Sequence, residues 1–271
     1  MVQNVHWFQV CADTDTSVLQ DYEGTMWLPE TLAWLEPFLP GWRMLVVGVP
    51  AAVLYSGAAA ALAGWLRSHC KVRVPYTRKV FHFTIMSAAG VAHLAWGLPG
   101  VVILGSVTAL LMILAVVKGS GFPFYEAMAR PSDAPHRTLF ILIPLTTTAL
   151  GGVLANLLFS PFAPIGYMVT GWGDAVGEPA GTRWGKHRYR VPSLAGVTAT
   201  RSLEGSGAVF VAGAVAAALT LFGMGYNASV SVGAGMACGA AGAVVEAFSN
   251  HGLDNLTVQL ATTALAWALL G

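Results

Sequence analysis

Long apolar stretches separated by short polar segments dominate the chain, and they predict helices that cross a membrane. A helix needs about 20 apolar residues to span roughly 30 Å of hydrocarbon. Five stretches are strongly apolar over such a length: Met44–Leu66, Val101–Val117, Leu139–Phe159, Ser206–Phe222 and Leu256–Gly271. Three others are weaker: Val80–Leu98, Phe162–Gly181 and Ser229–Phe248. We therefore predict an all-α, polytopic transmembrane helix bundle of about eight spans, which occupies residues 41–271.

The amino-acid composition agrees with a membrane protein. Hydrophobic residues make up 55% of the 271 residues and charged residues only 10%, whereas a soluble globular chain carries roughly 25% charged residues. This composition excludes a disordered chain and a coiled coil, and the net charge of +1 gives no reason to expect nucleic acid as a partner. Cys11, Cys70 and Cys238 lie far apart and without a CxxC spacing, so they predict neither a disulfide framework nor a zinc site.

Charged residues between the apolar stretches predict how the bundle is oriented. Six acidic residues and no Lys or Arg precede Arg43. With eight spans, the later basic groups fall in loops on one face: Arg67–Lys79, Lys118–Arg137 and Arg183–Arg201. The excess of Lys and Arg makes that face cytoplasmic, which in a bacterium means the cytoplasmic membrane, with the N-terminus outside. Residues 1–40 are expected to form an extramembrane or interfacial segment rather than a signal peptide.

Carboxylates inside the predicted spans are the first candidate site residues. A carboxylate near the bilayer centre costs about 2.5–3.5 kcal/mol, so its presence there calls for a function. Asp174 and Glu178 lie one helical turn apart in the fifth span, and they repel each other unless a cation or a proton lies between them. Oxygen ligands at this spacing suit Mg²⁺ held together with phosphate oxygens. The structural alternative is one protonated and one paired carboxylate within the bundle.

Two neighbouring stripes with a period of four residues run along this span. The first is made of glycines and predicts close helix packing: Gly173, Gly177, Gly181 and Gly185. The second is polar, and packing does not explain it: Asp174, Glu178, Thr182 and Lys186. Pro179 cannot donate a backbone hydrogen bond and loosens the helix between them.

The segment that follows this span combines basic and small residues. Its basic side chains are crowded between Arg183 and Arg201, and it closes with Ser202-Leu203-Glu204-Gly205-Ser206. Arg and Lys bind phosphate oxygens, small residues allow close backbone approach, and carboxylates hold a metal. We therefore predict a site for a metal-bound triphosphate, with a simple topology signal as the alternative. Its phosphate-binding residues would be Lys186, Arg188, Arg201, Ser202, Gly205 and Ser206.

Two more polar clusters lie at span ends on the same predicted face. In the first, His82 lies one helical turn after Arg78 and close to Lys79, which favours contact with a phosphate or a substrate. The second is the turn from Glu246 to Asp254-Asn255. Capping of a helix explains Asp254 but not Glu246, which lies eight residues earlier and still within a predicted span.

Together these motifs resemble the CTP-dependent polyprenol kinases, a family that includes phytol kinase, dolichol kinase and the CTP-dependent diacylglycerol kinase. The similarity covers about residues 76–260 and consists of three motifs in the family's order. These are the Arg78-Lys79…His82 cluster, the stretch from Asp174 to Ser206, and the Glu246…Asp254-Asn255 turn. Arg201 is a departure, because the family usually has Lys at this position.

The resemblance implies transfer of the γ-phosphoryl group of CTP to the hydroxyl of a membrane isoprenoid alcohol such as phytol or a polyprenol. Asp174 and Glu178 would bind Mg²⁺, with Glu204 and Asp254 as further ligands. Lys186, Arg188 and Arg201 would hold the phosphates, and Arg78, Lys79 and His82 would contact the transferring group or the acceptor. Glu246 would orient or deprotonate the lipid hydroxyl, and the nucleotide would arrive from the cytoplasm.

Three alternatives stay open at this point. Diacylglycerol is the second choice of acceptor. A phosphatidate cytidylyltransferase would share the Asp174–Ser206 half of the pattern, but the Lys-Asp and His-Gly-Gly-rich stretch typical of that family is missing. An ion-coupled transporter would also use carboxylates at membrane depth, although the polar groups here gather at one face and no inverted repeat is visible.

Overall fold

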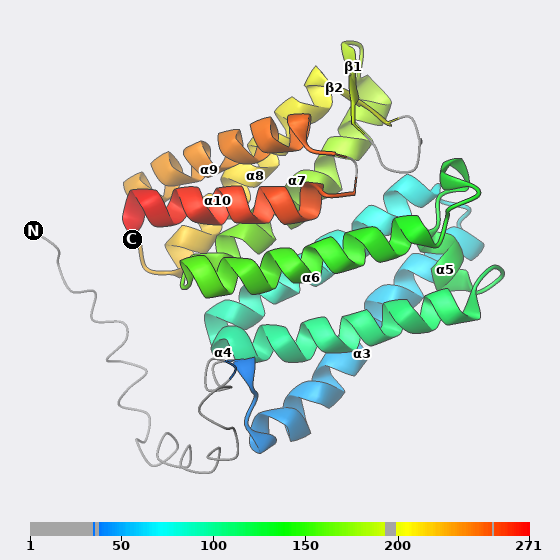
Figure 1. Ribbon diagram of the computed structural model, residues 1–271, viewed down its shortest axis with the longest axis horizontal. Helices are drawn as coiled ribbons and strands as arrows, with labels where there is room; N and C mark the ends of the chain where they lie inside the picture. The colour runs from blue at the N-terminus through cyan, green and yellow to red at the C-terminus, as the bar shows by residue number, and fades with distance from the viewer. Residues whose placement is uncertain (1–34, 36–37, 193–198, 251) are drawn as a thin grey trace, which may run out of the picture.

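The computed structural model describes residues 35, 38–192, 199–250 and 252–271, and these form a bundle of helices (Figure 1). The predicted segment 1–40 therefore lies almost entirely outside the described residues, as does His251 in the Glu246–Asn255 turn. The helices longer than ten residues are α3 (Trp42–Ser68), α4 (Val74–Lys118), α6 (Leu139–Phe159), α7 (Ala163–Trp184), α8 (Leu203–Gly223), α9 (Ala228–Phe248) and α10 (Asp254–Leu270). Shorter elements are α5 (Pro123–Met128), the 3₁₀ turn η3 (Pro131–Asp133) and the strands β1 (Arg188–Val191) and β2 (Ala199–Ser202).

The helical fold confirms the predicted all-α membrane architecture. Each of the eight predicted apolar stretches coincides with helical residues, and two of them belong to α4. Among the described residues, five helices are long and apolar enough to cross a membrane: α3, α4, α6, α8 and α9. The number of eight crossings and the outside position of the N-terminus remain predictions.

Helix α4 accounts for two predicted spans because the chain reverses direction within it. Gly97 interrupts the helical backbone at φ +65° and ψ −160°, a conformation that L side chains rarely adopt and glycine adopts easily. Pro99 follows, and its missing amide hydrogen makes it a suitable start for the second limb. The limbs of residues 74–96 and 98–118 thus form an antiparallel pair (Figure 1).

The connections divide between the two ends of the bundle according to their charge. In Figure 1 the α3–α4 connection and α5 lie at the right, and the β1–β2 hairpin and the α9–α10 turn lie above them, right of centre. The three basic groups predicted to share one face belong to these segments. The reversal at Gly97 and the α6–α7 and α8–α9 connections lie at the other end. The candidate site residues are therefore collected at one end of the molecule.

Helix α7 lies at the centre, packed against α4, α8 and α10. The glycine stripe on α7 faces α8 and the end of β2: a methyl group on Gly173 would come 3.0 Å from Val209, and one on Gly181 would come 3.0 Å from the Ser202 hydroxyl. These are close-packing positions, as the sequence indicated, and they bring the hairpin directly against the carboxylate-bearing helix.

The same kind of close packing between α8 and α9 gives a stability prediction. A methyl group on Gly239 of α9 would lie 2.5 Å from the Ala214 nitrogen and 2.7 Å from the Phe210 oxygen. Backbone atoms cannot give way cheaply, so we expect Gly239→Ala to lower the free energy of unfolding by about 1–3 kcal/mol. Thermal unfolding in detergent measures this change.

Gly233 on the same helix is the matched control. Apart from its chain neighbours and its own helix backbone, no described atom lies within 4 Å of a methyl group added there, and alanine favours a helix over glycine by up to about 1 kcal/mol. Gly233→Ala should therefore unfold at the parent's temperature or slightly above it. Equal unfolding temperatures for Gly233→Ala and Gly239→Ala would contradict the packing described for α8 and α9.

Candidate active site

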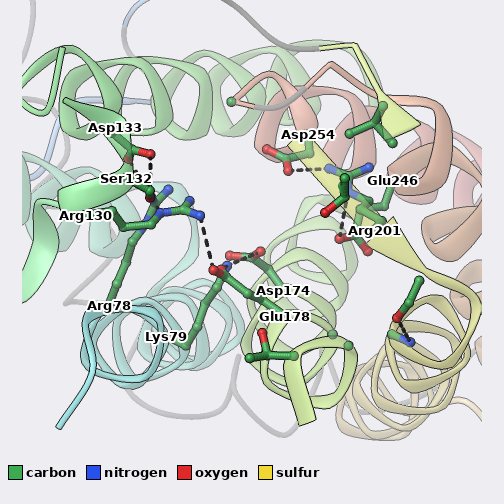
Figure 2. Close-up of a pocket in the computed structure, with 18 of the residues that line it drawn as sticks. Arg78, Lys79, Arg130, Ser132, Asp133, Asp174, Glu178, Arg201, Glu246 and Asp254 are labelled. Atoms are coloured by element: carbon green, nitrogen blue, oxygen red, sulfur yellow. Dashed lines mark hydrogen bonds and ion pairs between the residues drawn. The ribbon is translucent and has the colours of Figure 1, made fainter. Parts of the chain in front are cut away.

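A polar cavity of about 660 Å³ opens at the end of the bundle that carries the hairpin. Its lining comes from the start of α4, the segment 130–136, the second half of α7, the hairpin, the start of α8, and the α9–α10 turn. Figure 2 shows charged side chains on two opposing sides of this space. Segments more than 170 residues apart in the sequence, from Arg78 to Asp254, thus meet at one cavity.

The first side, which we call the α4–α7 wall, is organised around Lys79. Lys79 of α4 is only 5% exposed, and its ammonium group donates to Asp174 and lies 2.9 Å from Glu178 Oε2. Both carboxylates project from the same face of α7, one turn apart. The cation that the sequence required between two such carboxylates is thus an amino group of the protein itself.

Arg130 extends this wall and also comes from a segment outside the spans. Its guanidinium lies 3.1 Å from Glu178 Oε1 and 3.6 Å from Asp133 Oδ2. Burial disfavours the cation, but the negative charges of Glu178 and Asp133 outweigh this effect and raise the pKa of Arg130 above its ordinary value. Asp133 is itself 2% exposed, so this ion pair is an integral part of the wall.

The sequence did not identify Arg130 or Asp133 as site residues. Arg130 was counted only within the basic group Lys118–Arg137, as a topology signal. The available hint was the run Arg130-Pro131-Ser132-Asp133, which places a cation and an anion three residues apart around a proline. Arg130 precedes η3, which the other three residues form. Arg130, Ser132 and Asp133 line the cavity.

The opposing side, the hairpin wall, is organised around Arg201 of β2. Its guanidinium lies 2.8 Å from Asp254 Oδ2, at the start of α10, and 3.8 Å from Glu246 Oε1, near the end of α9. All three side chains are 14–17% exposed. Arg201 pairs with Tyr189 of β1, and this strand pairing positions Arg201 at the cavity.

On each wall an arginine has a buried guanidinium nitrogen that has no hydrogen-bond partner among the described residues. These are Arg78 Nη1 on the α4–α7 wall and Arg201 Nη1 on the hairpin wall, and both atoms are buried without an acceptor in the described part of the chain. Figure 2 shows the two side chains on opposite sides of the space. Buried donors are nearly always satisfied in folded proteins, so this pair indicates an anionic ligand between the walls.

Most of the residues predicted from the sequence line this one cavity: Arg78, Lys79, Asp174, Glu178, Arg188, Arg201, Ser202, Gly205, Ser206, Glu246 and Asp254. His82 lies beside the cavity, with its Nε2 3.8 Å from Asp174 Oδ2. Ser202 also caps α8, because its hydroxyl accepts a hydrogen bond from the Gly205 amide at 3.1 Å.

Besides His82, two predicted residues are not brought into the lining, Lys186 and Glu204. Helix α7 ends at Trp184, so the four-residue stripe stops before Lys186, whose side chain is exposed. The Glu204 carboxylate accepts from the His187 amide and lies 2.8 Å from the ring nitrogen Nδ1 of His187. The structure therefore gives neither a phosphate contact for Lys186 nor a place for Glu204 beside Asp174.

The described residues contain no group of three or more His, Cys, Asp or Glu side chains arranged to hold a metal ion. The donors that do face the cavity are hard carboxylate oxygens: Asp174 and Glu178 on one wall, Glu246 and Asp254 on the other. This donor set fits a divalent cation that takes its remaining ligands from a bound phosphate rather than from a complete protein cage.

Comparison with known proteins identifies a relative over most of the chain. The chain is 31% identical to the phytol kinase of Synechocystis sp. over 233 residues, which cover 85% of this chain and 93% of that protein. No family model matches the sequence. No solved structure matches it either.

Proposed function

Because the chain belongs to the phytol kinase family, we propose that it transfers the γ-phosphoryl group of CTP to the hydroxyl of a membrane isoprenoid alcohol. Membership of this family makes it a lipid-alcohol kinase and an integral membrane protein. The nucleotide, the specific alcohol and the requirement for Mg²⁺ belong to the proposal. Phytol or another isoprenoid alcohol is the first choice of acceptor, and diacylglycerol is the second.

The opposed guanidinium groups of Arg78 and Arg201 carry the proposal. Both arginines line a cavity of about 660 Å³, which lies within the range of ligand-binding pockets, and the Nη1 atom of each is buried without a hydrogen-bond partner among the described residues. A triphosphate held between the walls would satisfy both donors and spread its charge over several cations. Arg188 lines the same cavity from β1 and would contact the phosphates or the sugar.

Asp174 and Glu178 are the residues we propose for Mg²⁺, with Asp254 on the opposite wall as a further ligand. Phosphoryl transfer is mostly a matter of positioning and charge neutralisation, and bound Mg²⁺ supplies the neutralisation of charge at the transferring phosphate. Glu204 is left out of this set, because its carboxylate contacts His187.

Glu246 is the residue we propose to accept the proton of the lipid hydroxyl. Its side chain is 15% exposed and lines the cavity. The distance from its Oε1 to Arg201 Nε is 3.8 Å, which is too long for a hydrogen bond. The hydroxyl oxygen would bond to the γ-phosphorus while the bond from that phosphorus to the β-phosphate oxygen breaks. CDP and the lipid monophosphate would then leave from the same cavity. His82 and Asp174 would help to position the transferring group.

The position of the cavity suits both substrates. It lies at one end of the bundle, beside loops that carry most of the Lys and Arg residues, so we propose that it faces the cytoplasm, where nucleotides are available. A lipid alcohol with its hydroxyl at the membrane surface would reach the same depth from within the bilayer.

Incubation with radiolabelled nucleotides tests the proposed reaction. Membranes containing the protein should convert phytol and short polyprenols to monophosphates with γ-labelled CTP, and at least about tenfold more slowly with γ-labelled ATP. Thin-layer chromatography and mass spectrometry of the extracted lipids measure the products, and membranes without the protein serve as the control.

The same experiment separates the alternatives. Phosphorylation of diacylglycerol but not of isoprenoid alcohols would replace the proposed acceptor. Release of pyrophosphate with formation of a CDP-lipid would indicate a cytidylyltransferase. Equal or better use of ATP would overturn the proposal of CTP as the donor, and unaltered lipids with every nucleotide would overturn the kinase proposal itself.

A further inference from the structure

Lys79 occupies the position in which a divalent cation would contact both Asp174 and Glu178. Its ammonium donates to Asp174 and lies 2.9 Å from Glu178, and the side chain is 6% exposed. Lys79 also lines the cavity, as does Arg78, whose Nη1 atom has no hydrogen-bond partner in the described part of the chain. A metal cannot bind to both carboxylates while this ammonium group remains between them.

Removal of the ammonium group from this position has a definite electrostatic consequence. A metal that bound alone would leave Lys79 buried without its counter-charges, which is unfavourable. A metal that arrives with phosphates brings new negative oxygens into the cavity, and the long, flexible lysine side chain can turn towards them. The charges of Lys79 and of both carboxylates are then compensated before and after the exchange.

We propose that Lys79 is a displaceable counter-cation, which holds the place of the metal between Asp174 and Glu178 and moves to the phosphates when a metal–nucleotide complex enters. The site then binds metal and nucleotide together and discriminates against free metal. This inference rests on the proposed metal site and adds to it a reason why binding of the two ligands is coupled.

Binding of Mn²⁺ in the absence of nucleotide and lipid tests this role. Mn²⁺ is the probe, and electron paramagnetic resonance of the purified protein in detergent measures the free ion. Lys79→Met removes the competing cation but keeps most of the side-chain volume. It is expected to bind one Mn²⁺ at least about tenfold more tightly than the parent protein.

Two further variants assign the effect to this site. Lys118→Met makes the same substitution at an exposed position of the same helix, and it should bind Mn²⁺ as weakly as the parent. The double variant Lys79→Met/Asp174→Asn should lose the added binding, because one of the two carboxylates is gone. Should Lys79→Met fail to fold, Lys79→Gln takes its place, since its amide can still donate to one carboxylate.

Equal Mn²⁺ affinity in the parent protein and in the folded Lys79 variant would overturn the inference. Tight binding of Mn²⁺ by the parent protein in the absence of nucleotide would also overturn it. The experiment uses neither CTP nor lipid, so its result is independent of the phosphorylation assay. A gain of Mn²⁺ binding in a protein that phosphorylates no lipid would support the role of Lys79 and refute the proposed function. Lipid phosphorylation without a gain of Mn²⁺ binding in the Lys79 variant would support the proposed function and refute the role of Lys79.

Discussion

Asp174→Asn is expected to lower the rate of lipid-alcohol phosphorylation at least about hundredfold, the scale observed when one preorganised charge-stabilising group is removed from an active site. Asp174 accepts from Lys79, lies 3.8 Å from His82, and faces the cavity. Its amide analogue keeps the shape but binds a divalent cation poorly and leaves Lys79 with half of its counter-charge. The initial rate of lipid phosphate formation at saturating nucleotide and Mg²⁺ measures the effect.

Glu126→Gln is the matched control for this substitution. Glu126 lies at the same end of the bundle, in α5, and pairs with Arg137 at 2.8 Å outside the cavity. The control also removes one carboxylate charge and should retain at least about half of the parent's rate, because a partly exposed ion pair contributes little. Full activity of Asp174→Asn in a folded protein would refute the metal assignment, and thermal unfolding of each variant identifies any loss that is merely structural.

Arg201→Met is expected to reduce activity about hundredfold and to destabilise the protein as well. The substitution removes the unpartnered Nη1 donor of the hairpin wall, and it also takes away the ion-pair partner of Asp254 and Glu246. A buried ion pair broken on one side typically costs about 3–5 kcal/mol. Steady-state kinetics with varied nucleotide should show a raised KM together with a lowered kcat, and unfolding in detergent should occur at a lower temperature.

Arg201→Lys and Arg190→Met complete this comparison. The lysine variant keeps a positive charge but not the planar fork of donors, so it should recover part of the stability and less of the activity. Arg190 belongs to the same hairpin but not to the cavity lining. Its loss should leave kcat and KM within about twofold of the parent's values and the unfolding temperature close to the parent's. If Arg190→Met and Arg201→Met behaved alike, the hairpin would act through its general charge and not through the contact with Asp254.

The sequence predicted the helices well because the membrane imposes a simple requirement on them. About 20 apolar residues are needed per crossing, and all eight apolar stretches coincide with helical residues. The convergence of Arg78, Asp174, Arg201 and Asp254 followed from the same requirement. Arg78, Arg201 and Asp254 lie beside span ends that the charge pattern placed on one face. Asp174 lies further inside its span, in the half that leads to that face.

The positions that could not be predicted from the sequence depend on local backbone geometry. Arg130 reaches Glu178 only because the segment after α5 folds over the cavity, and a basic loop carries no signal of such folding. Lys186 shares a four-residue spacing with Asp174, but this spacing loses its meaning once α7 ends at Trp184. Glu204 lies at the start of α8, where strand pairing brings His187 next to it. A two-stranded sheet was not predicted at all.

The pairing of charges across the cavity has a consequence for how a nucleotide finds it. Formal charges of the lining cancel, five against five: Arg78, Lys79, Arg130, Arg188 and Arg201 against Asp133, Asp174, Glu178, Glu246 and Asp254. The lining by itself therefore contributes little attraction for anions beyond a Debye length of about 8–10 Å, and long-range attraction is left to the basic residues of the loops beside the cavity. Discrimination between ligands begins only after a ligand has entered and the internal ion pairs have exchanged partners.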